Sequence, residues 1–134
     1  MSGIVNGLRY EQGVFIPALK FGGNSVGMVG TYNGFYTIVD SILFYSIDIA
    51  LTNKGSSTGA ATITGLPYST VNNNTIAPIA FERVDLTGST TIVAMINGST
   101  IDIKVEKNND AFSTLDNTDF NNNSHLYIAG AYRM

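Results

Sequence analysis

The chain has 134 residues, a formal net charge of -3 and no cysteine, and only 13% of its residues are charged, about half the usual ~25%. This composition predicts one domain and excludes disulfides and thiolate metal sites, and the seven scattered lysines and arginines argue against a nucleic-acid partner. No apolar run approaches the ~18 residues of a membrane span and the N-terminus lacks a signal-peptide pattern, so we expect a soluble chain with no membrane insertion.

The first stretch, Met1 to Gln12, contains glycines and has no clear hydrophobic period. We interpret it as an N-terminal arm that anchors the protein or contacts partner chains, ahead of a β-domain over Gly13 to Met134. Val14 to Phe21 then predicts a short strand at a sheet edge or with a bulge, because Pro17 cannot donate a hydrogen bond to a ladder.

Turn signals follow this strand. Gly22 to Ser25 is rich in glycine and is predicted to form a turn. Tyr32 to Val39 contains Asn33-Gly34, which predicts a turn followed by a strand.

The long strand predicted over Ser41 to Thr52 is the element around which we expect the domain to form. Its opposite faces differ: one begins apolar at Ile42 and Phe44 and ends polar. A strand that is apolar on both faces at one end needs cover on both sides there, so we predict that Ile42 and Phe44 contact another copy of the chain. The other face is apolar throughout at period two, which is typical of a strand that lies on a core: Leu43, Tyr45, Ile47, Ile49 and Leu51.

The rest of the chain predicts short strands between polar turns. Asn53 to Gly59 lacks the Gly-Lys-Ser/Thr end of a phosphate-binding loop, so we expect it to join two strands. Asn97-Gly98 predicts a hairpin between the strands on either side of it. Strands are predicted at Ala60–Thr64, Ile79–Val84, Thr91–Ile96, Thr100–Glu106 and Leu126–Tyr132, and loops at Ser69–Thr75 and Asn108–Ser124, the second with at most a short helical turn.

These elements predict an all-β fold, either an antiparallel β-sandwich or a jelly roll. About seven to nine strands are expected, with turn signals every eight to twelve residues and no helical period of useful length. The 39 Asn, Thr and Ser residues fit this class, because Thr favours strands whereas Asn and Ser favour turns.

Several motifs of the chain occur together in one known module. The chain from Gly13 to Tyr132 resembles the C-terminal β-sandwich module of bacteriophage tail fibres and tail spikes, most weakly between Ser69 and Asn109. The residues that carry the resemblance are Gly13 to Leu19, then Gly34, Tyr36 and Thr37, then Lys54 to Ile63 (KGSSTGAATI), then Gly65-Leu66-Pro67-Tyr68, and finally Asp119-Phe120 and Ile128 to Tyr132.

The resemblance implies a homotrimer at a fibre tip and a structural rather than a catalytic module. It implies a virion protein, made in the host cytoplasm and acting outside the cell, that attaches to a host-surface glycan and meets other virion proteins through Met1 to Gln12. The module usually ends a much longer chain, whereas here it is nearly the whole sequence, so an excised domain and a small virion protein both fit. A trimerisation cap or a capsid decoration such as a head fibre, without a receptor role, is the alternative, and a depolymerase fragment is a third hypothesis.

Groups for catalysis or metal binding are sparse, so we expect no enzyme, no cofactor and no bound metal. His125 is the single histidine, and we expect it to be a solvated loop side chain. The carboxylates considered for glycoside hydrolysis are Asp40, Asp48, Glu82 and Asp85. The oxygen ligands considered for calcium are Asp110, Asp116, Asn117 and Asp119, which lack EF-hand spacing and are expected to cap turns instead.

Tyrosines and asparagines supply the groups that bind sugars, through aromatic faces and amide hydrogen bonds. We consider Tyr32, Tyr36, Tyr68, Tyr127 and Tyr132, together with the Asn-rich loops. Tyrosine in a small β-domain also serves the core with its hydroxyl at the rim. The ligand-binding set that we predict is Tyr32 and Tyr68 with Asn72, Asn73 and Asn74.

Overall fold

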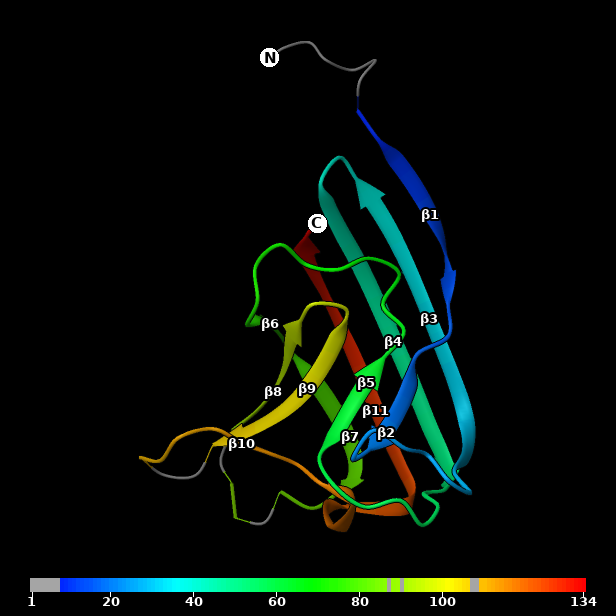
Figure 1. Cartoon of the computed structure of the whole chain (residues 1–134), viewed down its shortest axis with the longest axis vertical. Coiled ribbons are helices and arrows are strands. Elements are labelled where there is room, and N and C mark those ends of the chain that lie inside the picture. Colours follow the sequence, from blue (N-terminus) through cyan, green and yellow to red (C-terminus); the bar gives the residue numbers. More distant parts are fainter. Residues whose placement is uncertain (1–7, 87, 90, 107–108) are drawn as a thin grey trace.

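Strands dominate the computed structural model, which describes residues 8–86, 88–89, 91–106 and 109–134 (Figure 1). Within these ranges the one helical element is a short 3-10 turn, η2 (Asn117–Asp119). The strands are β1 (Tyr10–Phe15), β2 (Ala18–Phe21), β3 (Val29–Val39), β4 (Ile42–Asn53), β5 (Ala61–Thr64), β6 (Thr75–Ala77), β7 (Ile79–Val84), β8 (Thr91–Asn97), β9 (Thr100–Glu106), β10 (Ser113–Thr114) and β11 (Phe120–Arg133).

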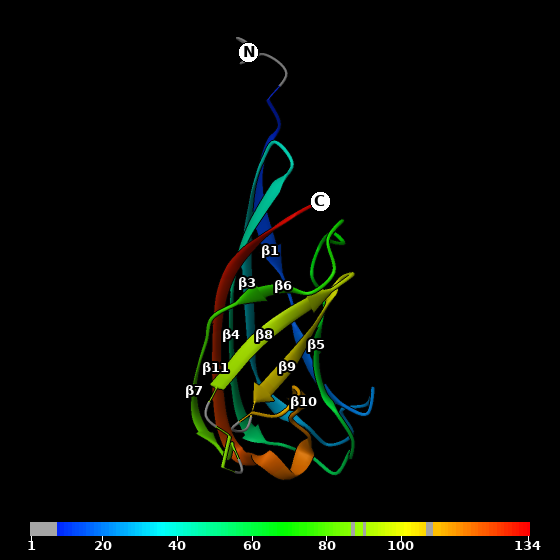
Figure 2. The same ribbon diagram turned by 90° about the vertical axis from the view of Figure 1, so that its left-hand side faces the viewer.

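The strands form two antiparallel sheets. Sheet A has the strand order β1-β3-β4-β11-β7, and sheet B has the order β2-β5-β9-β8-β6, with β10 pairing to β9 outside this order. Figure 2 shows the sheets as two layers, an arrangement consistent with a β-sandwich. The prediction of an all-β antiparallel fold is therefore confirmed.

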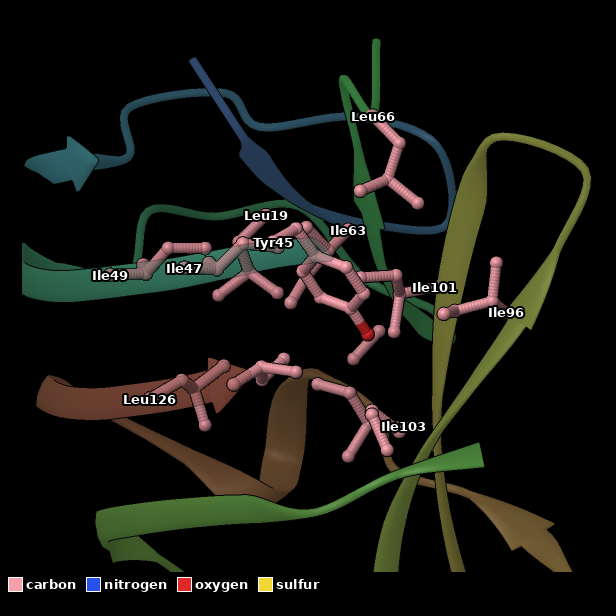
Figure 3. Packing of buried hydrophobic residues seen from close by; sticks show 14 of the residues in the cluster. Leu19, Tyr45, Ile47, Ile49, Ile63, Leu66, Ile96, Ile101, Ile103 and Leu126 are labelled. Atoms are coloured by element: carbon pink, nitrogen blue, oxygen red, sulfur yellow. The ribbon is translucent and has the colours of Figure 1, made fainter. Parts of the chain in front are cut away.

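The core lies between the layers, and β4 supplies one whole face of it. All five odd positions from Leu43 to Leu51 are at most 4% exposed, as the period-two pattern predicts. Figure 3 shows side chains of β4, such as Tyr45 and Ile47, next to those of sheet B, such as Ile63 and Ile101. Each such side chain contributes about 1.5–3 kcal/mol on burial, so β4 is a main source of stability.

Several elements lie where the sequence predicts them. The chain breaks between β1 and β2 at Pro17, and β7 spans the predicted Ile79–Val84. Asn97 and Thr100 pair across the predicted hairpin, where Gly98 has a φ of 60°, a value that glycine adopts without strain. The segment Asn53 to Gly59 leads from the end of β4 toward the start of β5, so the predicted inter-strand loop is confirmed.

The turn predicted at Asn33-Gly34 is wrong, because β3 runs through it without interruption. Gly34 is buried beneath the ring of Phe15, where an added Cβ would approach the ring atoms to 2.8 Å. The glycine is needed here for close packing between β1 and β3 rather than for a change of direction.

The prediction of a loop over Asn108–Ser124 is wrong on both sides of η2, where the structure has strands. Ser113–Thr114 forms β10, and β11 already begins at Phe120, where the ring is buried against Phe21 with centroids 5.2 Å apart. The predicted helical turn is confirmed as η2, which Asp116 and Asp119 cap reciprocally, in agreement with the turn-capping interpretation of these carboxylates. With β6 and β10 added, eleven strands are found among the described residues, more than the seven to nine predicted.

The N-terminal arm is shorter than its predicted boundary suggests. β1 begins at Tyr10, so Tyr10 to Gln12 pair with Thr37 to Val39 as part of sheet A. Arg9 accepts a backbone hydrogen bond from Asp40 in the β3–β4 turn, so the chain enters sheet A at this end (2.8 Å). The arm interpretation of residues 1–7 lies outside the described residues.

None of the described residues belongs to a helix with the length and hydropathy of a membrane span.

Two buried tyrosines near the end of β11 differ in how their hydroxyls are used. Tyr45 and Tyr132 pack with ring centroids 5.9 Å apart, and burial raises the pKa of both, that of Tyr132 to about 12. The Tyr132 hydroxyl donates to the carbonyl of Tyr68. The Tyr45 hydroxyl is buried and has no hydrogen-bond partner among the described residues.

Tyr45→Phe is therefore expected to be as stable as the wild type or more stable, because it removes an unsatisfied buried hydroxyl that costs about 1–3 kcal/mol. The matched variant Tyr132→Phe loses a made hydrogen bond and should cost about 0.5–1.5 kcal/mol. The urea midpoints of the two variants measure the difference. A Tyr45→Phe midpoint as low as that of Tyr132→Phe would contradict this account.

Candidate functional site

The outward faces of the two sheets differ in chemistry. On sheet B, cross-strand neighbours on the outward face include Lys20, Thr62 and Asp102, which are charged or hydroxyl side chains. On sheet A the corresponding face carries large exposed apolar groups, with Phe35 58% and Phe44 48% exposed. Exposed apolar patches of this kind are typical of interaction surfaces.

A groove of about 580 Å³ crosses the outward face of sheet A. It is lined by residues of β3, β4, β7 and β11, with Phe35 and Tyr127 as its aromatic members. The register explains its shape, because Phe35 lies beside Ser46 and Ser46 beside Ala129, so small side chains occupy the middle of the sheet. The next row holds Asn33, Asp48, Tyr127 and Ala80.

At one end of the groove, Asp48, His125 and Tyr127 form a continuous chain of hydrogen bonds. His125 Nε2 lies 2.6 Å from Asp48 Oδ1, and Tyr127 Oη lies 2.9 Å from His125 Nδ1. The ionised carboxylate can only accept, so Nε2 donates to Asp48, whereas the direction of the bond between Tyr127 Oη and Nδ1 depends on the tautomer of the imidazole. The rings of His125 and Tyr127 also stack, with centroids 4.1 Å apart.

The expectation that His125 is a solvated loop side chain is wrong. It lies on β11, its side chain is 21% exposed, and both ring nitrogens have partners. Desolvation, followed by the charges of Glu82 and Asp48, raises the pKa of Tyr127. A side-chain hydrogen bond with Glu82 adds to this rise.

The predicted ligand residue Tyr68 belongs to a different cluster, close to where β1 begins. Its hydroxyl lies 3.3 Å from Glu11 Oε2, which also accepts from Tyr36 at 2.8 Å, and the Arg9 guanidinium lies 5.1 Å from the Tyr68 ring centroid. The hydrogen bond from Tyr36 and the pairing with Arg9 lower the pKa of Glu11, and the same bond raises the pKa of Tyr36. These contacts fasten the start of β1 to the loop after β5.

The predicted asparagines lie on that same loop, and Tyr32 does not. Asn73 Oδ1 accepts from the Gly98 amide (3.1 Å), and the Asn74 amide donates to the carbonyl of Ile96 (2.9 Å), so the loop is docked on the β8–β9 hairpin. Tyr32 is half-buried and packs against the core from the inward side of β3. It lies four residues, or about 13 Å, along the strand from Tyr36, the neighbour of Tyr68. Tyr68 and Asn72 to Asn74 therefore share a loop but have different contacts, Tyr68 against Tyr36 and the asparagines at the β8–β9 hairpin, and Tyr32 lies apart from them.

The predicted contact residues Ile42 and Phe44 lie at the end of β4 nearest the β3–β4 turn. Phe44 is exposed on the outward face of sheet A, beside Thr37 and Ala131. Ile42 is half-buried and pairs with Val39. Both positions are accessible to another chain.

The carboxylates considered for hydrolysis do not form a group of four. Asp48 lies beside Tyr127, and Glu82 beside His125, so these two flank β11. Asp40 lies in the β3–β4 turn and Asp85 follows β7. Over the ranges that the structure describes, no cluster of three or more His, Cys, Asp or Glu side chains could hold a metal ion.

Comparison with known proteins adds no relative: no family model and no curated protein matches the chain. Asp48, His125 and Tyr127 were each considered from the sequence, as a carboxylate, the single histidine and one of the tyrosines, whereas the groove residue Phe35 was missed. Their proximity was not visible, because Asp48 and His125 are 77 residues apart and meet only through the pairing of β4 with β11.

Proposed function

We propose that the chain is a non-enzymatic bacteriophage virion protein whose β-sandwich, of jelly-roll type, assembles as a homotrimer and forms an appendage or fibre tip that attaches to a host-surface glycan. The observation that carries this proposal is the change in chemistry along the outward face of sheet A. The half nearest the β3–β4 turn is apolar, and the half beyond it is polar. The apolar half comprises Val14, Phe44 and Ala131, the polar half comprises Asn33, Asp48, Glu82, His125 and Tyr127, and the row of Phe35, Ser46 and Ala129 lies between the two halves.

The apolar half supports contact between copies of the chain. Val14 and Phe44 are 72% and 48% exposed, so a single chain leaves them in water. Burial of such rings drives association, because about 25 cal/mol is gained for each Å² of apolar surface removed from water. The surface has few charges to be desolvated, so a second copy of the same chain can cover it at low electrostatic cost.

The position of the apolar half supports attachment through the N-terminal arm. β1 enters sheet A beside the β3–β4 turn, the same end at which Phe44 and Ile42 lie. Three chains joined there would present the polar half of each sheet farther from the virion. Weak binding at each chain is then sufficient, since three linked sites raise the effective concentration.

The test combines molar mass with glycan binding. Light scattering at micromolar concentration should give three times 14.3 kDa, and the labelled protein should bind bacterial saccharides on a glycan array. A monomer overturns the proposal. A trimer that binds no saccharide leaves the structural alternative, a trimerisation cap or capsid decoration, as the better description.

A further inference from the structure

We infer that the groove on the outward face of sheet A binds an uncharged pyranose, with Phe35 and Tyr127 against the sugar ring and Asp48 accepting hydrogen bonds from its hydroxyls. This inference rests on the glycan-binding role proposed above and assigns that role to a site that differs from the predicted Tyr68 loop. The groove, at about 580 Å³, is within the ~300–1,000 Å³ that small-molecule sites occupy.

Two aromatic rings border a space that small side chains leave open. Phe35 on β3 and Tyr127 on β11 are 58% and 38% exposed, and they lie on the two strands that flank β4. Ser46 on β4 lies beside Phe35, and Ala129 lies beside Ser46, two residues along β11 from Tyr127. A pyranose carries C–H groups on one face, so it can bury that face against a ring while its hydroxyls remain at the edge.

Asp48 supplies a fixed acceptor for those hydroxyls. His125 Nε2 donates to one carboxylate oxygen at 2.6 Å, and no described residue is paired with the other oxygen. The carboxylate side chain is 50% exposed, so a ligand can reach it. Hydrogen bonds to a charged acceptor are about twice as strong as neutral ones, and Asn33, the cross-strand neighbour of Asp48, adds an amide donor and acceptor.

The charge of the groove selects against anionic sugars. Among the described residues that line it, the charged side chain is Asp48, and Glu82 lies beside His125 on the next strand. Arg83, the nearest cation in sequence to Glu82, pairs with Glu82 and with the carbonyl of Asn123. A sialate or uronate carboxylate would therefore meet the charges of Asp48 and Glu82, and Arg83, which is close enough to lower the pKa of Tyr127, is already paired with Glu82.

Asp48 also argues against a second copy of the chain as the occupant of this half. A protein surface that covered the carboxylate would take it out of water, which costs several kcal/mol unless a cation is supplied. Sugar hydroxyls replace the lost water hydrogen bonds directly. The cross-strand neighbours of Phe44 are Thr37 and Ala131, with Arg133 beside Ile42 at the end of the sheet, and this difference assigns the two halves to different occupants.

The experiment measures binding of methyl glycosides of glucose, galactose and N-acetylglucosamine, and of methyl glucuronide, by ligand-observed NMR and on a glycan array. The neutral glycosides should bind and the glucuronide should not. Asp48→Asn should weaken binding at least tenfold, and Tyr127→Ala or Phe35→Ala should abolish it. The matched controls Asp110→Asn and Tyr68→Ala should bind as the wild type does.

Each outcome decides between the proposals. Wild-type binding that all three groove variants retain overturns the inference and leaves glycan attachment elsewhere on the molecule. Glucuronide binding equal to that of the neutral sugars overturns the charge argument. Dissociation of the trimer by Tyr127→Ala would mean that a second copy fills the groove. A wild type that binds no saccharide overturns both the inference and the attachment role.

Discussion

Ile47→Asp is expected to abolish cooperative folding. Ile47 is 3% exposed, and β4 pairs with β3 on one side and β11 on the other, so the new carboxylate has no route to solvent. The substitution loses about 1.5–3 kcal/mol of apolar burial and adds the cost of an unpaired buried charge. The sum is comparable to the whole stability of a domain, about 5–15 kcal/mol. Urea denaturation followed by circular dichroism should show no cooperative transition.

Ile76→Asp is the matched control for this change. It makes the same chemical substitution on β6, where the isoleucine is 58% exposed, and should alter the free energy of unfolding by no more than about 0.5 kcal/mol. A folded, cooperative Ile47→Asp protein would show that β4 is not the centre of the core. Unfolding of both variants would instead indicate a chain too marginal to tolerate any added charge.

Phe44→Asp is expected to convert trimers into monomers without unfolding them. The ring is 48% exposed in the single chain, so the fold does not depend on it, whereas the proposed contact between copies does. A central apolar residue of an interface contributes about 2 kcal/mol or more, and in a trimer the loss recurs at three equivalent contacts. Light scattering at micromolar concentration should show the molar mass falling to one third, with the circular dichroism spectrum unchanged.

The control for this prediction is Phe112→Asp. Phe112 is also 48% exposed, and it lies just before β10 rather than on the outward face of sheet A. It should leave the molar mass unchanged. A Phe44→Asp protein that remains trimeric would place the contact between copies on another surface.

The strands that a local pattern reports were predictable from the sequence. β4 and β9 alternate apolar and polar residues, because one face of each lies on the core and the other does not, and their inward residues are buried as expected. Pro17 and Asn97-Gly98 end strands for reasons that act within a few residues. Such features do not depend on which strand is the neighbour.

Features that depend on pairing between distant strands were missed. Asn121 to Ser124 suggests a loop by composition, yet it belongs to β11 at a bulge opposite Arg83. There Ser124 Oγ accepts from the Asn121 amide (2.8 Å) and donates to the carbonyl of Arg83 (2.6 Å), so a buried hydroxyl replaces the ladder hydrogen bonds that the bulge removes. The candidate groove was hidden for the same reason, since its residues come from four strands.

The place of β11 in sheet A has a consequence for synthesis of the protein. β11 is the last described strand in the chain, yet it lies in the middle of sheet A, between β4 and β7. Until it emerges from the ribosome, β4 and β7 each expose an unpaired edge, and such edges recruit other chains. Sheet A therefore cannot be completed until Phe120 to Arg133 have been synthesised, long after β4 has emerged.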